Sequence, residues 1–138
     1  VLGTIAMGAQ GAWLGTLWMA ARENHTPAAL LQRLVDSASE DTLITRAHSG
    51  KPCRVVRSEW IDAWQQAGAP RPLDMPLQQV LTGDVFASMH EHGDPRLIYE
   101  AAGQSVFAIQ GETTVAEQMA GLVEGMERAW SRLERLAA

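Results

Sequence analysis

Residues 8–16, with the sequence Gly-Ala-Gln-Gly-Ala-Trp-Leu-Gly-Thr, decide the fold class. The short apolar stretch over residues 1–8 is typical of the last turns of a helix that ends at Gly8. Residues 11–15 are an apolar run bounded by glycines. This run is too short for an independent helix, so it predicts a fully buried parallel strand. A helix end, a glycine turn and a buried strand together form the α-to-β step of an α/β protein.

The remainder of the chain predicts mainly helices. The expected elements are a helix begun by Thr26 and Pro27, a short strand at 42–45, a turn at 49–52, a short helix begun by Ser58, a loop at 69–76, a helix over 77–91, a short helix over 95–102 and a long last helix begun by Thr113 or Thr114. A buried parallel strand needs neighbours on both sides, and the sequence offers none. We therefore expect the chain to be a piece of a larger protein.

Composition excludes several classes of protein. The 138 residues suit one domain, and 46% hydrophobic with 20% charged residues is typical of a folded one. No apolar run is long enough to span a membrane. A formal net charge of -5 argues against nucleic acid as the main partner. The single cysteine, Cys53, excludes an internal disulfide framework and fits a cytoplasmic location.

The glycine-rich stretch is also the strongest chemical signal. Glycine at the end of a strand lets a ligand approach the backbone, whose amides can then point at an anion. Thr16 adds a hydroxyl donor, and a short helix over 17–22 would begin at the same place. In (β/α)8 barrels a phosphate site lies here, after the last strands. Spacing alone leaves glycines that serve only packing as the alternative.

Three ordered motifs resemble the nitronate monooxygenase family, formerly called 2-nitropropane dioxygenases. Residues 8–21 resemble its last barrel strand, and Thr45-Arg46-Ala47-His48-Ser49-Gly50-Lys51-Pro52-Cys53-Arg54 is similar to its threonine-arginine, glycine-arginine-proline-x-arginine segment. Ala101-Ala102-Gly103-Gln104-Ser105 is similar to its alanine-glycine-glutamine element. Where family members commonly have arginine and phenylalanine after the glycine-threonine pair, this chain has Leu17 and Trp18.

The resemblance implies the C-terminal portion of an FMN-binding (β/α)8 TIM barrel with a mainly helical extra domain. Residues 1–25 would be the last βα unit, 26–100 the helical substrate-side domain, and 101–138 a flavin-proximal loop with a helix that packs on the barrel. The residues implied to bind FMN are Trp13, Leu14, Gly15 and Thr16 at the phosphate, and Gln104 and Ser105 near the flavin.

The implied activity is oxidation of alkyl nitronates by dioxygen to a carbonyl compound and nitrite. Two alternatives stay open: an FMN-dependent enoyl-acyl-carrier-protein reductase with the same barrel, and a non-catalytic helical interaction module. The family's catalytic histidine lies upstream of these motifs, so we assign no catalytic residue and expect the chain to be inactive alone. A homodimer is left open.

Other candidate groups favour structural roles. His90 and His92 diverge on either a helix or a strand, so no metal site is predicted. His48 is more typical of a hydrogen-bonded structural histidine, and Cys53 of an inert thiol. Lys51, Arg54 and Arg57 could meet one anion or line a solvated loop, and spacing does not decide between these.

Overall fold

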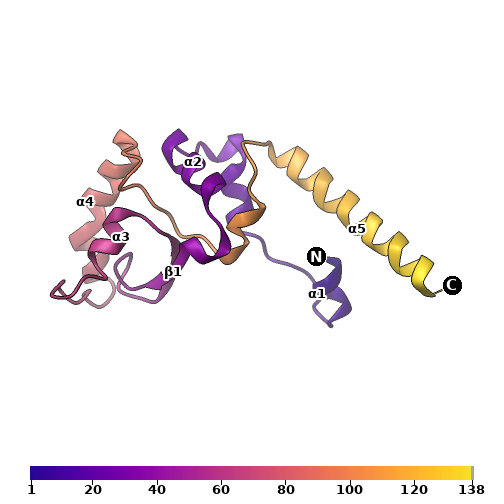
Figure 1. Cartoon of the computed structure of the whole chain (residues 1–138), viewed down its shortest axis with the longest axis horizontal. Coiled ribbons are helices and arrows are strands. Elements are labelled where there is room, and N and C mark those ends of the chain that lie inside the picture. Colours follow the sequence, from indigo (N-terminus) through magenta and orange to yellow (C-terminus); the bar gives the residue numbers. More distant parts are fainter. Residues whose placement is uncertain (138) are drawn as a thin grey trace.

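The computed structural model describes residues 1–137 as helices around one small sheet (Figure 1). The regular elements are α1 Leu2–Ala6, α2 Ala28–Asp36, β1 Thr42–Thr45, β2 Cys53–Val56, α3 Glu59–Ala63, α4 Leu77–His92 and α5 Val115–Ala137, with the 3-10 turns η1 Thr16–Ala20, η2 Arg22–Asn24, η3 Ser39–Asp41 and η4 Gln104–Ala108. Among the described helices, none has the length and apolar character that crossing a membrane requires.

The sheet is a β1–β2 hairpin that a third segment extends. The two strands pair antiparallel, with Thr42 opposite Val56. Gly50 lies in the turn between them with φ 87°, a conformation that favours glycine. On the other side of β2, the Val56 amide donates to the Glu100 carbonyl oxygen at 3.0 Å and the Ala102 amide donates to the Arg54 carbonyl oxygen at 3.1 Å.

This pairing corrects the prediction of a helix over residues 95–102. A single turn follows Asp94, where the Ile98 amide donates to the Asp94 carbonyl oxygen at 3.0 Å. The chain then extends to Ala101, which bridges Val55. The reason is tertiary: the free edge of β2 supplies backbone partners to this segment, which local helical pairing would otherwise provide.

A compact apolar core lies between α2, the hairpin and residues 98–109. Its fully buried members come from segments far apart in the sequence, which explains why the middle of the chain packs as one unit. They include Leu34, Val55, Val56, Ile61, Ile98, Tyr99 and Val106.

The N-cap residues predicted from the sequence are confirmed for one helix and wrong for another. Ser58 caps α3 as predicted, because its side chain accepts a hydrogen bond from the Ile61 amide. Thr26 does not cap α2. Its hydroxyl donates instead to the Met19 carbonyl oxygen at 2.6 Å, and Pro27 takes the cap position. The predicted helix over 77–91 is confirmed as α4 and runs uninterrupted through Gly83.

The predicted buried strand over residues 11–15 is wrong in this structure. The segment is irregular, and Trp13 is 99% exposed. Within the described residues the sheet consists of β1 and β2, and neither strand pairs with this segment. Without hydrogen-bonded neighbours an apolar run cannot form a buried strand. The helix end at Gly8 is confirmed, with α1 followed by Gly8 at φ 99°.

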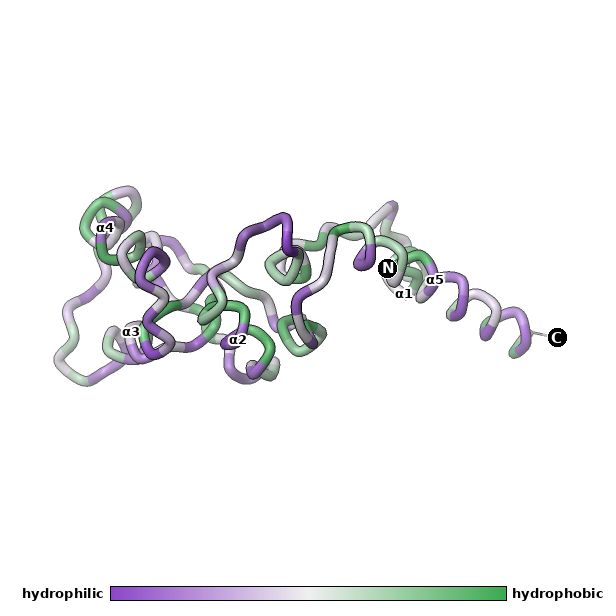
Figure 2. The backbone as a smooth tube through the Cα atoms, turned by 90° about the horizontal axis from the view of Figure 1, so that it is seen from above, coloured by the Kyte–Doolittle hydropathy of each residue, from purple (hydrophilic) through white to green (hydrophobic). Residues whose placement is uncertain are grey.

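The two ends of the molecule differ in packing. α1 and α5 lie at one end and α4 at the other, in both views (Figures 1 and 2). α1 contacts α5, which otherwise extends away from the core (Figure 1). The alternating hydrophilic and hydrophobic turns of α5 are visible in Figure 2. Thus the last predicted helix is confirmed, although no part of the described core covers most of its apolar face.

Candidate functional site

The structure brings together two of the three sequence motifs. The Thr16 Oγ1 atom accepts a hydrogen bond from the Gly103 amide at 2.9 Å, across 87 positions of sequence. η1 and η4, which begin at these two points, pack against each other. A Cβ atom built on Gly103 would lie 3.5 Å from Thr16 Oγ1 and 3.7 Å from Ser105 Oγ. Two hydroxyls therefore flank the same glycine.

The Thr16 hydroxyl has its donor available. A threonine hydroxyl has one donor and two acceptor positions. The Gly103 amide occupies one acceptor position, and within residues 1–137 the hydroxyl donates to no protein atom. It can therefore donate to a ligand while it stays anchored to Gly103.

The segment before Thr16 presents unpaired backbone donors. In the part of the chain that the structure describes, the amides of residues 11–15 donate to no protein acceptor. Gly11 and Gly15 have open space where a Cβ would be. Successive free amides can bind a phosphate where they converge on one point. The segment lacks the strand that the sequence predicts, yet retains the donors.

The other predicted site residues are less enclosed. Trp13 projects into solvent and Leu14 is half-buried. Gln104 and Ser105 are exposed side chains at the start of η4. The Gln104 carbonyl oxygen accepts from Ser39 Oγ at 2.9 Å, which fixes its backbone. The structure thus gathers Thr16 with residues 103–105 and leaves Trp13 outside this group.

A cluster of aromatic and histidine side chains lies beside β2, and no sequence pattern predicted it as a unit. His48 Nδ1 lies 3.3 Å from the Tyr99 hydroxyl, and both rings stand edge-on to Phe86. Burial, with a smaller effect of Glu100, raises the pKa of Tyr99 to about 12, so this hydroxyl stays protonated at neutral pH. His90 Nε2 lies 3.1 Å from the Tyr99 carbonyl oxygen. Of these contacts, the sequence could have indicated only that of Phe86 with His90, which are four residues apart on one helix.

The remaining candidate groups do not converge. Arg54 donates to Thr42 Oγ1 at 3.0 Å, whereas Arg57 pairs with Asp62 at 2.7 Å, so the predicted basic cluster is divided between two structural contacts. Burial, with a smaller contribution from Glu100, raises the pKa of the Cys53 thiol, which disfavours the reactive thiolate. Among the described residues, no three His, Cys, Asp or Glu side chains are placed to hold a metal ion.

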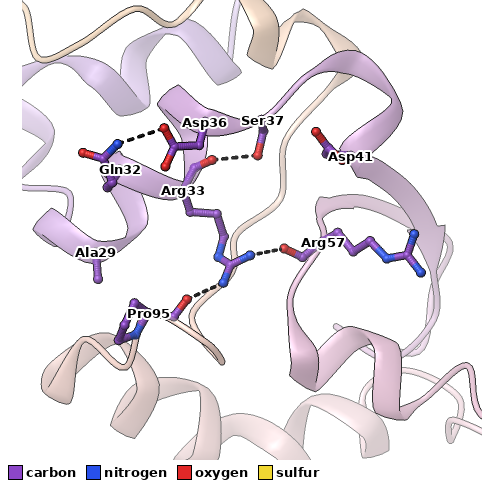
Figure 3. Close-up of a pocket in the computed structure, with 8 residues that line it drawn as sticks. All are labelled: Ala29, Gln32, Arg33, Asp36, Ser37, Asp41, Arg57 and Pro95. Carbon is purple, nitrogen blue, oxygen red and sulfur yellow. Dashed lines mark hydrogen bonds between the residues drawn. The ribbon is translucent and has the colours of Figure 1, made fainter.

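A cavity of about 540 Å³ surrounds Arg33 on α2 (Figure 3). The Arg33 guanidinium donates to the carbonyl oxygens of Arg57 at 2.6 Å and of Pro95. Burial lowers the pKa of Arg33, while Glu59 and Asp62 oppose that effect. The arginine therefore ties α2 to two loops. The cavity is lined by Arg57, one of the three candidate basic residues, but by none of the residues implied to bind FMN. Its central cation, Arg33, already donates to backbone acceptors of two loops.

Comparison with known proteins identifies the chain's relatives. The family model described as nitronate monooxygenase matches residues 1–125. A Mycobacterium tuberculosis protein assigned as a monooxygenase is 36% identical over 105 residues, which cover 75% of this chain and 25% of that protein. A Staphylococcus aureus protein assigned as a nitronate monooxygenase is 32% identical over 105 residues, covering 76% and 29%. The chain spans about a quarter of the length of these relatives.

Solved structures resemble the chain over nearly its whole length. The nitroalkane oxidase from Streptomyces ansochromogenes matches with a TM-score of 0.81 and 25% identity, covering 96% of this chain and 37% of that one. FabK from Thermotoga maritima matches with a TM-score of 0.78 and 20% identity, covering 98% and 42%. The fold is therefore that of a part of these enzymes, with mixed helices and a small sheet.

Proposed function

The chain belongs to the nitronate monooxygenase family, and we propose that it forms part of an FMN-dependent enzyme that oxidises alkyl nitronates with dioxygen to a carbonyl compound and nitrite. The observation that carries the proposal is the hydrogen bond between Thr16 and Gly103, which joins the two motifs expected to lie at the cofactor. In this proposal residues 1–25 are the last βα unit of the barrel, and residues 11–15 form its strand only where neighbouring barrel strands pair with them. Residues 26–100 are the substrate-side domain, and 101–138 the flavin-proximal loop and last helix.

The share of this chain would be to hold the phosphate end of FMN. The free amides of residues 11–15 supply donors, and the Thr16 hydroxyl adds another. Because the Gly103 amide holds the threonine oxygen in place, the side chain loses less freedom when a ligand binds, which lowers the entropy cost of binding. When bound, FMN supplies the electron transfer between nitronate and dioxygen.

Trp13, Leu14, Gln104 and Ser105 would complete the same site. Gln104 and Ser105 follow directly after the anchored Gly103, so their positions are coupled to that of Thr16. Trp13 and Leu14 adjoin the phosphate donors. The exposed indole of Trp13 offers a flat apolar surface that a bound cofactor or the rest of the protein could cover.

The phosphate contact is tested by replacing Thr16 in the complete natural polypeptide. Thr16→Val should weaken FMN binding by roughly 1–2 kcal/mol, because it removes one charge-assisted hydrogen bond. Thr16→Ser keeps the hydroxyl and should retain affinity. The dissociation constant is measured by quenching of flavin fluorescence. Unchanged affinity in Thr16→Val removes Thr16 from the site.

The reaction is tested separately from the cofactor. Bound flavin with nitrite release from a simple alkyl nitronate in air supports the proposal. Flavin with NADH oxidation in the presence of an acyl thioester, and no nitrite, supports the enoyl reductase instead. A purified protein without flavin absorption leaves the non-catalytic interaction module.

A further inference from the structure

A buried glutamine in the first turn of α5 reaches the backbone of η1. Gln118 is only 8% exposed, and its Nε2 donates to the Leu17 carbonyl oxygen at 3.0 Å, across 101 positions of sequence. The same nitrogen donates to Thr113 Oγ1 at 2.6 Å. Because a carbonyl oxygen only accepts hydrogen bonds, the amide nitrogen must be the atom that faces Leu17. The contact lies one residue after Thr16, the central residue of the candidate site.

The remaining carbonyl groups near the end of η1 are also bonded from outside the turn. The Met19 carbonyl oxygen accepts from the Thr26 hydroxyl at 2.6 Å. The Ala20 carbonyl oxygen accepts from the Thr113 amide at 2.9 Å. A short 3-10 turn leaves its last carbonyl groups without partners of its own, so these contacts hold it in place. Of these three contacts, the one from Gln118 lies nearest to Thr16 in sequence.

The two contacts at Thr16 and Leu17 restrict different parts of the chain. The Gly103 amide donates to the Thr16 side chain, whereas Gln118 donates to the backbone of the next residue. A side chain held at its tip can still move with its backbone. The contact from Gln118 fixes the backbone from which the Thr16 hydroxyl projects. It also fixes the downstream end of residues 11–15, whose amides have no protein acceptor within the described residues.

The buried amide of Gln118 is not fully satisfied. Within residues 1–137 its Oε1 is buried and accepts no hydrogen bond from a protein atom. Such an acceptor costs free energy, and an apolar side chain of similar size would avoid that cost. Burial alone therefore does not explain an amide at this position. The hydrogen bond that it donates to η1 does.

We propose that Gln118 is a positioning residue for the phosphate end of FMN, which acts by holding the backbone of η1 so that the Thr16 hydroxyl and the amides before it stay directed at the phosphate. The inference rests on the proposed function, because it assumes that FMN binds at Thr16. Gln118 does not touch the cofactor in this proposal. It acts through Leu17 and Thr16.

The affinities of FMN and riboflavin test this role, since the two flavins differ by the phosphate alone. The complete natural polypeptide is stripped of its flavin and titrated with each, and the quenching of flavin fluorescence gives the dissociation constants. Gln118→Met keeps the size of the side chain and removes the donor. It should raise the dissociation constant of FMN roughly 10-fold, the change that corresponds to one hydrogen bond. The dissociation constant of riboflavin should stay unchanged.

Gln78 provides the matched control. It is also fully buried on a helix, and its Nε2 also donates to a backbone carbonyl oxygen, that of Ala47, at 3.0 Å. It lies on α4, away from Thr16 (Figure 1). Gln78→Met should lower the thermal stability measured by circular dichroism and leave the affinity for FMN unchanged. The control therefore separates loss of a buried amide in general from loss of the contact with η1.

Two further variants sharpen the test. Thr113→Val removes the hydroxyl that Gln118 contacts and keeps the backbone pairing of Thr113, so it should weaken FMN binding in the same direction by a smaller factor. This variant carries the test if Gln118→Met does not fold. The double variant Thr16→Val with Gln118→Met should weaken FMN binding by less than the product of the single effects, because both changes act on one contact.

The outcomes distinguish this inference from the proposed function. A wild type that binds FMN no more tightly than riboflavin contradicts the phosphate site itself, and the role of Gln118 with it. A wild type that prefers FMN, with the same preference in Gln118→Met and Thr113→Val, overturns only the role of Gln118. Equal weakening of FMN and riboflavin in Gln118→Met overturns it too, as does an equal loss of FMN affinity in Gln78→Met.

Discussion

Residues 28–109 and the helix α5 are similarly rich in apolar side chains but use them differently. In the first region Leu34 and Ile98 are fully buried. On α5, by contrast, Met119, Trp130 and Leu133 are each about half exposed. The middle region brings together segments distant in sequence, whereas α5 contacts α1 and, at its start, residues 17–23 through Val115 and Gln118. Similar composition therefore gives a buried core in one region and an uncovered face in the other.

The difference shows what holds each region. A helix without tertiary packing depends on local effects. α5 has them at its start, where the Thr114 amide donates to Glu117 at 2.7 Å and the Glu117 amide donates to the Thr114 hydroxyl at 3.1 Å. Trp130 adds a hydrogen bond to Glu134 at 2.7 Å. The middle region instead relies on burial, which contributes more per residue.

The largest effect should come from deleting buried side chains. In the 138-residue chain Leu34→Ala should lower the free energy of unfolding by about 2–5 kcal/mol, because it removes core contacts and leaves a cavity. Leu133→Ala, at a half-exposed site, should cost less than about 1 kcal/mol. Urea unfolding followed by circular dichroism measures both. Equal costs would mean that a second molecule covers α5 in solution, which would erase the contrast between the regions.

Replacing glycine by alanine should change the free energy of unfolding less than the leucine deletion does, and the change should have opposite signs in the two regions. Gly50 has φ 87°, and an added Cβ would meet the Leu73 carbonyl oxygen at 2.6 Å. Gly50→Ala should therefore destabilise the chain by roughly 1–3 kcal/mol. Gly121, in α5, has open space around it, and Gly121→Ala should favour the helix by up to about 1 kcal/mol. Thermal melts of both variants decide the signs. Loss of stability in Gly121→Ala would show that α5 packs closely there.

The smallest effect concerns the pH dependence of α5. Hydrogen bonds from the Thr114 amide and hydroxyl lower the pKa of Glu117. The stabilisation from this carboxylate is therefore fully present above the ordinary glutamate pKa and is lost as the pH falls through the lowered value. Helicity measured by circular dichroism should decrease over that window. Glu117→Gln should remove this part of the decrease, so identical curves for the two proteins would contradict the capping role.

Local signals in the sequence predicted much of the fold. The run at 42–45, the cap at Ser58, the turn at Gly50 and the helices α4 and α5 each depend on neighbours in sequence. The prediction of a helix over residues 95–102 was wrong because the free edge of β2 forms hydrogen bonds with the backbone of this segment. β2 itself was missed, because Cys-Arg-Val-Val is short and contains a charge whose stabilising partner, Thr42, lies on the other strand.

For the candidate site, too, the sequence predicted the local pattern and missed the contact between distant segments. The glycine-threonine pattern pointed to Thr16, but the contact that fixes it comes from Gly103, far along the chain. No spacing rule links these positions. The same is true of the aromatic cluster, which draws His48 and Tyr99 from separate segments. Only the resemblance to a family placed the motifs of Thr16 and Gly103 at one site, because it rests on several motifs in a fixed order along the chain.

The pairing of Ala21 with Thr113 has a consequence for how the protein could be altered. The Arg22 amide donates to the Thr113 carbonyl oxygen at 2.8 Å, and the Thr113 amide donates to the Ala20 carbonyl oxygen at 2.9 Å. The polypeptide between these points therefore leaves and returns at one place, with its own core inside. Such a segment can be exchanged as a cassette: a homologous stretch joined at the same two residues would keep the flanking backbone, and its length could vary freely between them.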